Sequence, residues 1–389
     1  MNSIPIYNKN FYSDEFIINP YPFYKEMREL GEVVYLPGLS NYAITSYEES
    51  KEVLRNWRIF SSARGVAGDE IGSKILKGNT LASDPPVHSQ MRKAMGNPLT
   101  SKKLERVEDT IEKLAENIVK KLIKIERFDC IKDLASFLPL QVVTKLVGLP
   151  NYGRKNMLDW GSAAFNCLGI QNRRGKLGLK KIKIAKEWIE KNAVKENLVV
   201  DSWTYKIHEL VEKGLLGKEQ CPMIIRDYIS PSLDTTISAI GHLVYLLGKN
   251  PEEFEKLKNN KDLIDNTIDE SIRLFSPIRS FSRITKENYS LSEYIIPKGS
   301  RVMILYASAN RDEKKFQQAD KFMIDRKPFD HIGFGHGIHS CPGMHLAKLE
   351  MKYILKNIIK YVDKVVVGKP KIALNNTIYS FSELEVSFN

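Results

Sequence analysis

A glycine-rich stretch around one cysteine, residues 331–343, constrains this chain more than any other part of its sequence. It reads His-Ile-Gly-Phe-Gly-His-Gly-Ile-His-Ser-Cys-Pro-Gly, and a helical pattern begins directly after it, near Met344. Glycines let a backbone turn tightly and approach a flat ligand closely. Backbone N–H groups and a helix N-terminus beside Cys341 lower the pKa of its thiol, which predicts a thiolate that serves as a metal ligand or a nucleophile. The alternative is a buried structural cysteine.

The order of residue types in this stretch favours the metal ligand. The pattern Phe-Gly-x-Gly-x-His-x-Cys-x-Gly resembles the haem-binding loop of cytochromes P450. This resemblance implies a mainly α protein with small β-sheets, in which a triangular helical prism encloses haem b within a single domain, residues 1–389. It also implies that the thiolate of Cys341 is the axial ligand of the haem iron. The other residues of the pattern that it assigns to the haem site are Phe334, Gly335, His339 and Gly343.

Length, charge and cysteine usage narrow the class of protein. The chain has 389 residues, 42% of them hydrophobic, and a net charge of +12. Lysines are spread over nearly every helical segment without stacking aromatics, which favours a solvated surface or an acidic protein partner over nucleic acid. The four cysteines have no CxxC spacing, and we expect reduced thiols in a cytoplasm. We find no membrane span and no signal peptide, and we expect a monomer.

Two basic residues share one face of the helix that Asp84-Pro85-Pro86 begins. His88 and Arg92 are four residues apart, so they lie one turn from each other. Two donors on one face suit a carboxylate. The segment Asp-Pro-Pro-x-His-x-x-x-Arg is similar to the one that binds a haem propionate in cytochromes P450. The resemblance adds Arg283 and His339 as further propionate ligands.

The longest helical pattern of the chain, residues 217–247, contains Pro231. A proline inside a helix removes one N–H group, which predicts a kink just before Asp234 and Thr235. An acid next to a hydroxyl at this place resembles the P450 pair that delivers protons during oxygen activation. The family usually has Ala-Gly where this chain has Pro231-Ser232, while the acid–alcohol pair is intact.

A Glu-x-x-Arg motif lies on the predicted helix that covers residues 263–274. An ion pair three residues apart is weak evidence by itself. Together with Arg326, however, Glu270 and Arg273 resemble the Glu-Arg-Arg network behind the haem loop of cytochromes P450. We expect these three residues to have a structural role.

The substrate is predicted from a more local resemblance. Arg226, Phe165 and Phe281 together resemble bacterial P450s that oxidise para-substituted aromatic carboxylates such as methoxybenzoates. The glycine- and serine-rich residues 60–81 are predicted to form a long loop, which in compact domains is often functional. The predicted substrate-binding residues are Arg64, Phe165, Arg226, Asp227, Ser230 and Phe281.

Asp227 leaves two alternatives open for the polar end of the substrate. At about 100° per residue, Asp227 lies roughly 80° around the helix from Thr235, while Arg226 lies roughly opposite Thr235. An ionised Asp227 would repel a benzoate unless Arg64 or Arg226 compensates its charge. A carboxylate is favoured because two arginines border the site against one acid. A neutral or basic aromatic substrate is the alternative.

The resemblance implies a monooxygenase that inserts one atom of O2 into a small aromatic substrate, by hydroxylation or O-demethylation. Electrons are expected from an acidic ferredoxin with its ferredoxin reductase, because a basic face suits such a partner. The same lysines could instead serve solubility alone. Two other functions are considered. A peroxide-driven peroxygenase is disfavoured by the pair Asp234-Thr235, which such relatives usually lack. A non-enzymatic haem-thiolate sensor would need an effector domain, for which no residues remain. The lysines predicted on the thiolate side are Lys93, Lys102, Lys103 and Lys348.

Overall fold

Helices make up most of the computed structural model, which describes residues 3–327 and 330–389. The helices are α1 (Asp14–Ile18), α2 (Tyr21–Leu30), α3 (Tyr47–Arg55), α4 (Glu70–Leu76), α5 (Val87–Gly96), α6 (Ser101–Leu122), α7 (Phe137–Val147), α8 (Asn151–Leu168), α9 (Arg173–Asn192), α10 (Trp203–Glu212), α11 (Cys221–Ile229), α12 (Asp234–Lys249), α13 (Pro251–Asn259), α14 (Ile264–Leu274), α15 (Tyr306–Ala309) and α16 (Met344–Tyr361). The strands are β1 (Val33–Leu36), β2 (Asn41–Ile44), β3 (Phe60–Ser61), β4 (Phe128–Asp129), β5 (Phe281–Thr285), β6 (Tyr289–Leu291), β7 (Tyr294–Ile296), β8 (Arg301–Ile304), β9 (Val365–Val367), β10 (Lys371–Ile372), β11 (Phe381–Glu383) and β12 (Glu385–Phe388).

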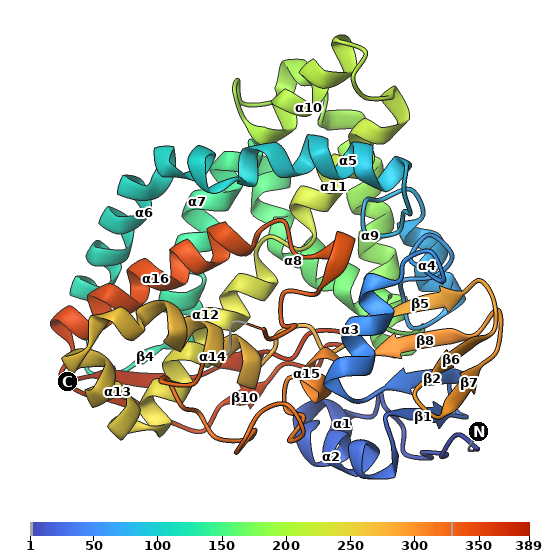
Figure 1. Cartoon of the computed structure of the whole chain (residues 1–389). Coiled ribbons are helices and arrows are strands. Elements are labelled where there is room, and N and C mark those ends of the chain that lie inside the picture. The colour runs from blue at the N-terminus through green and yellow to red at the C-terminus, as the bar shows by residue number, and fades with distance from the viewer. Residues whose placement is uncertain (1–2, 328–329) are drawn as a thin grey trace.

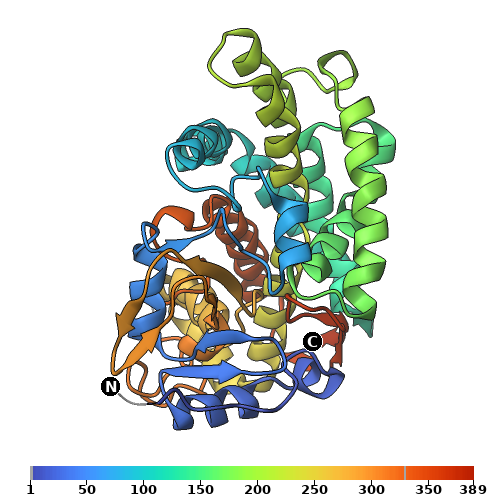
Figure 2. The ribbon, with the colours of Figure 1, turned by 90° about the vertical axis from the view of Figure 1, so that its right-hand side faces the viewer.

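The molecule has a triangular outline, with α10 at one corner and the largest sheet near another (Figure 1). This sheet has the strand order β1-β2-β8-β5-β3. Only the β2–β8 pair in it is parallel among the described strands, and it joins segments more than 250 residues apart. Turned by 90°, the molecule shows these strands at the lower left and the long helix α9 on the opposite flank (Figure 2). The prediction of a mainly α protein with small sheets is confirmed.

The helix that follows the cysteine loop, α16, is anchored along one face. Leu346, Ile354 and Ile358 are spaced in multiples of four and are all buried, as the helical period requires. The helix packs against α6 and α14. Because α16 begins at Met344, this packing also fixes the position of Cys341 immediately before it.

The long helix predicted for residues 217–247 is instead two helices, α11 and α12, with four non-helical residues between them. Pro231 lies in this break, where it has no N–H group to donate. Two hydroxyl groups take over part of the backbone hydrogen bonding. Ser232 Oγ donates to the Tyr228 carbonyl, and Thr235 Oγ1 donates to the Pro231 carbonyl at 2.8 Å. The place of the predicted kink is right, but the helix is interrupted rather than bent.

The predicted loop at residues 60–81 is also partly regular. It contains the short strand β3 and the seven-residue helix α4. Asp69 caps α4, because its Oδ1 accepts a hydrogen bond from the Gly72 N–H at 2.7 Å. A helix of this length that contains Gly72 and Ser73 gives no clear periodic signal.

The structure brings the three residues of the predicted ion-pair network together. Glu270 and Arg273 are fully buried, and Arg273 Nε and Nη2 donate to the two carboxylate oxygens of Glu270 at 2.7 and 2.9 Å. Arg326 Nε donates to Glu270 Oε1 at 3.1 Å. Arg273 Nη1 also donates to the carbonyls of Asn310 and Ala319. The network therefore ties α14 to the segment that leads to the cysteine loop.

In the part of the chain that the structure describes, none of the helices combines the length and the apolar character needed to cross a bilayer.

Candidate active site

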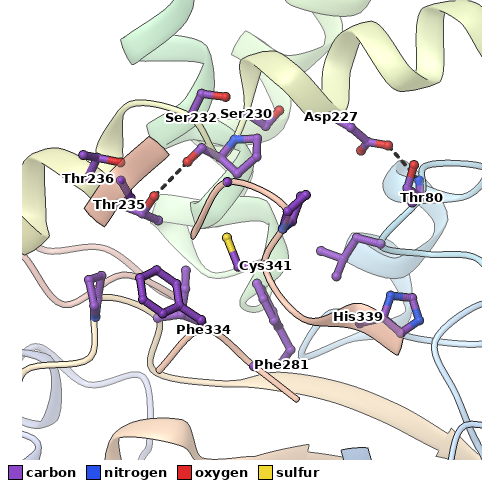
Figure 3. Close-up of a pocket in the computed structure, with 18 of the residues that line it drawn as sticks. Thr80, Asp227, Ser230, Ser232, Thr235, Thr236, Phe281, Phe334, His339 and Cys341 are labelled. Carbon is purple, nitrogen blue, oxygen red and sulfur yellow. Dashed lines mark hydrogen bonds between the residues drawn. The ribbon is translucent and has the colours of Figure 1, made fainter. Parts of the chain in front are cut away.

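A cavity separates the loop that holds Cys341 from the break between α11 and α12 (Figure 3). Residues of α5, α8, α11, α12, β5 and the loop line it. Four described residues of the predicted site, Arg64, His88, Arg226 and Asp234, do not line it. The predicted site residues that do are Arg92, Phe165, Asp227, Ser230, Thr235, Phe281, Arg283, Phe334, Gly335, His339, Cys341 and Gly343.

Two glycines shape the cysteine loop. Gly335 and Gly337 have φ values of 75° and 71°, in the left-handed region that favours glycine. A Cβ atom on Gly337 would lie only 2.6 Å from the Leu54 carbonyl oxygen. The Cys341 N–H donates to the Phe334 carbonyl at 2.8 Å, which closes the loop. The sulfur atom of Cys341 is thereby held at the cavity wall.

The protonation of Cys341 differs from the expectation. Burial raises the pKa of its thiol above the usual value, although the N–H groups of Gly343 and Met344 and the charge of Arg92 lower it, as predicted for such neighbours. The prediction that the pKa of this thiol is lowered is therefore wrong for the protein without a metal, because the loss of hydration outweighs the effect of the N–H donors. A metal cation bound to the sulfur deprotonates a thiol outright, so the site fits an iron ligand.

Four basic side chains gather beside the loop. The rings of His88 and His339 are 4.3 Å apart, and the buried Nε2 atom of each has no partner among the described residues. Arg283 is buried at 2% exposure, and Arg92 Nη2 donates to the Ser340 carbonyl. Burial and the two arginines, together with His88, lower the pKa of His339 to about 2. Unpartnered imidazole nitrogens and buried guanidinium groups fit the two propionates of a haem. His88 does not line the cavity and packs against the ring of His339.

The acid–alcohol pair lies at the first turn of α12. Burial raises the pKa of Asp234 to about 6, against the smaller effect of a hydrogen bond from Ser162. Thr235 lines the cavity, and its hydroxyl proton is engaged by the Pro231 carbonyl. The lone pairs of Thr235 Oγ1 are therefore free to accept a hydrogen bond from a donor in the cavity. Near neutral pH, Asp234 can take up and release a proton, and its carboxyl group contacts Ser162 on α8.

Glu350, on α16, lines the same cavity and was not among the predicted site residues. Its carboxyl group is fully buried, and neither oxygen has a hydrogen-bond partner among the described residues. Burial raises the pKa of Glu350 to about 8, so it is mostly neutral at pH 7. Its position four residues after Leu346, on the buried face of α16, is a sequence signal that could have identified it.

Asp227 is placed at the cavity wall by its contacts with the loop before α5. Its Oδ1 accepts from Asn79 Nδ2 at 2.9 Å, and its Oδ2 accepts from the Thr80 N–H at 2.8 Å (Figure 3). Burial raises the pKa of Asp227 to about 6, although these hydrogen bonds and the charge of Arg226 lower it. Asn79 and Thr80 also line the cavity, and the sequence analysis did not identify them.

The two arginines predicted at the substrate's polar end lie elsewhere. Arg64 is exposed to solvent, and Nη2 of Arg226 donates to the sulfur of Met223 on α11. Because neither arginine lines the cavity, neither is placed to bind a substrate carboxylate there. Of these three charged side chains, only Asp227 remains at the wall.

One of the four predicted docking lysines is already paired. Lys348 Nζ lies 2.5 Å from Asp269 Oδ1, which His331 Nε2 also contacts at 3.3 Å. Lys348 therefore braces the start of the cysteine loop and offers little free charge to a partner. Lys93, Lys102 and Lys103 are exposed and form no ion pair with any described residue.

Comparisons with known proteins show the family of this chain. The cytochrome P450 family model matches residues 206–366. Cytochrome P450 CYP199A2 of Rhodopseudomonas palustris is 30% identical over 377 residues, covering 96% of this chain and 92% of the relative. Beta-dihydromenaquinone-9 omega-hydroxylase of Mycobacterium tuberculosis is 27% identical, covering 95% and 76%. The crystal structure of CYP109E1 from Bacillus megaterium with testosterone matches with a TM-score of 0.86 at 26% identity, covering 97% and 100%. With this fold and a thiolate loop facing its cavity, the chain belongs to the cytochrome P450 family of haem-thiolate monooxygenases.

Proposed function

We propose that this cytochrome P450 oxygenates a small aromatic substrate, by hydroxylation or O-demethylation, with electrons from an acidic ferredoxin and its reductase. The observation that carries the proposal is one cavity with Cys341 on one side and Thr235 on the other (Figure 3). Phe165 and Phe281 belong to the same apolar cluster at its wall. Aromatic side chains of this kind favour a flat apolar ligand.

The described residues divide the work of the reaction among them. A bound haem supplies the iron at which O2 is activated, with Cys341 as its thiolate ligand. Arg92 and Arg283 would neutralise the haem propionates, and the neutral ring of His339 would help to hold them by a hydrogen bond. Asp234 supplies protons through Thr235, so that one oxygen atom leaves as water and the other enters a C–H bond of the substrate. If that carbon belongs to an O-alkyl group, the hydroxylated product is a hemiacetal, which splits into a phenol or alcohol and an aldehyde that carries the alkyl carbon.

Replacing Thr235 by alanine is expected to uncouple the reaction. Substrate still binds and NADH is still consumed, because neither depends on the hydroxyl group. Most electrons leave as hydrogen peroxide, since a misplaced proton donor costs on the order of a hundredfold or more in a proton-transfer step. The measurement is product and peroxide formed per NADH with a competent ferredoxin system.

Thr235→Ser is the matched control, because it keeps a hydroxyl group that can donate to the Pro231 carbonyl. It should retain most of the coupling. Wild-type coupling in Thr235→Ala would remove Thr235 from the proton relay. If the wild type forms product from hydrogen peroxide as fast as with the complete electron-transfer system, the peroxygenase alternative is favoured instead.

Three lysines support an acidic electron donor. Arg92 contacts the backbone beside Cys341, and its neighbour Lys93 points to solvent on the same helix. Lys102 and Lys103 follow at the start of α6, which packs against α16. Unpaired positive charge next to the thiolate loop attracts an acidic protein and raises the rate of encounter.

Reversing Lys93 and Lys102 to glutamate is expected to slow reduction by an acidic ferredoxin, with a loss of about tenfold or more at low salt. The salt dependence of the rate should flatten, since screening then has less attraction to remove. Stopped-flow reduction across a salt series measures both effects. Lys180→Glu with Lys183→Glu, on the exposed face of α9, changes the net charge equally and should leave the rate nearly unchanged. Equal slowing by both double variants would assign all these lysines to general charge.

A further inference from the structure

The charged residues that line the cavity fall into two groups. Arg92 and Arg283 lie on the side of the cysteine loop together with His339, which is neutral at pH 7, and all three are available there to the haem propionates. The acidic residues among the described lining are Asp227 and Glu350. Because burial raises the pKa of Glu350 to about 8, Asp227 is the acid that carries negative charge at pH 7. The part of the cavity left for a substrate is therefore negative.

The carboxylate of Asp227 is held in place without an ion pair to any described residue, although the charge of the neighbouring Arg226 partly offsets its own. Its two partners, the Asn79 amide and the Thr80 N–H, are neutral donors, one on each oxygen. Asp227 forms no ion pair within the described residues, and Nη2 of its neighbour Arg226 is engaged by Met223. Each carboxylate oxygen can accept about two hydrogen bonds, so one position on each remains open.

We infer that the substrate carries a protonated amine at the end opposite the carbon that is oxidised, and that Asp227 binds this amine. The inference rests on the proposed function and specifies its substrate class. Asp227 lies beside Thr80, apart from Thr235, so a ligand bound to it can extend toward Cys341 at the centre of the view (Figure 3). A charged hydrogen bond from ammonium to carboxylate is stronger than one between neutral groups, and it strengthens further away from water. A small aromatic amine with a para substituent fits these requirements.

The same carboxylate links substrate binding to the loop over the cavity. Asn79 and Thr80 precede α5 and are both buried. The ligand amine and this loop share one acceptor group. A bound amine therefore completes the hydrogen bonding of Asp227, whereas a bound carboxylate places two negative charges next to each other.

The test compares three para-methoxy compounds that differ mainly at one end: 4-methoxybenzylamine, 4-methoxytoluene and 4-methoxybenzoate. Each is titrated into the resting holoenzyme, and the shift of the Soret band toward high spin gives a Kd. The wild type should bind the amine at least about tenfold more tightly than the benzoate. Asp227→Asn should weaken the amine by about tenfold or more and leave the neutral compound within about twofold.

Asp227→Asn is a close match for the native residue. Asn79 Oδ1 is buried without a partner, so the Asn79 amide can turn to accept a hydrogen bond from the new amide. The Kd of 4-methoxytoluene shows whether the variant loosens the loop that holds Asn79 and Thr80. This separates the loss of the Asp227 charge from a change in the shape of the cavity. Arg64→Gln is the second control, and it should change none of the three constants, since Arg64 does not line the cavity.

Three outcomes would overturn the inference. The first is benzoate binding as tight as amine binding in the wild type. The second is equal effects of Asp227→Asn on all three compounds. The third is a red shift of the Soret band with the amine, which indicates that its nitrogen ligates the iron and lies at the wrong end of the cavity. Binding of the neutral compound keeps the proposed function separate, because that function fails only if no aromatic compound perturbs the spectrum.

Discussion

Arg273→Ala is expected to leave little folded protein. Arg273 and Glu270 are both fully buried, and their guanidinium and carboxylate groups share two hydrogen bonds. Removing one partner of a buried ion pair costs about 3–5 kcal/mol, because the other charge stays buried without compensation. The loss is a large part of a typical total stability of about 5–15 kcal/mol. The change also leaves the carbonyls of Asn310 and Ala319 without their donor.

Urea denaturation of the holoenzyme, followed by circular dichroism, measures this loss. Arg273→Lys is the second variant if the alanine variant does not fold, and it should lose less because it keeps a charge but not the paired geometry. Arg127→Ala removes an exposed ion pair with Glu385 and is expected to change the free energy of unfolding by less than about 1 kcal/mol. An Arg273→Ala protein as stable as the Arg127→Ala protein would contradict the structural role of this network.

Short motifs with fixed spacing are the parts of this site that the sequence predicted well. The cysteine loop, the His88–Arg92 pair and the Glu270–Arg273 pair each combine residues that are neighbours on one turn or one helix. Their relative positions follow from local geometry. Arg273 pairs with Glu270, and burial together with the charge of Arg92 lowers the pKa of His88. The helical period also placed Asp227 nearer the cavity than Arg226, as the structure does.

Contacts between residues far apart in the chain could not be predicted from the sequence. Lys348 was predicted to belong to a basic face for an acidic ferredoxin, but it pairs with Asp269, which is 79 residues away in the chain. Asp227 contacts Asn79 and Thr80 across nearly 150 residues, and this contact holds its carboxylate at the cavity wall. No periodicity or motif reports such pairs, because they depend on how complete helices and loops pack.

The break between α11 and α12 has a different cause. A proline inside a helical pattern predicts disruption but does not say whether the helix bends or stops. Here the hydroxyl groups of Ser232 and Thr235 donate hydrogen bonds to backbone carbonyls that lack a helical N–H partner, which stabilises the break. The prediction of one continuous helix is therefore wrong, because side-chain hydroxyl groups donate to carbonyls that backbone N–H groups would bind in a helix.

Cys341→Ser is expected to abolish both oxygenation and the thiolate signature of the haem. A serine hydroxyl stays protonated near neutral pH and is a poor ligand for iron compared with a thiolate. Activity should fall below detection, an effect larger than that of any other single change in the cavity. The matched control is Cys167→Ser, because Cys167 is a buried free thiol on α8 whose sulfur contacts the Gly175 carbonyl at 3.6 Å.

The most direct test of a haem-thiolate centre at Cys341 is the absorption spectrum of the reduced protein with carbon monoxide. The wild type and Cys167→Ser should both show the red-shifted Soret band that defines cytochromes P450, and Cys341→Ser should lack it. A red-shifted band that survives in Cys341→Ser, or one that is lost equally in both variants, would contradict the assignment of Cys341 as the iron ligand.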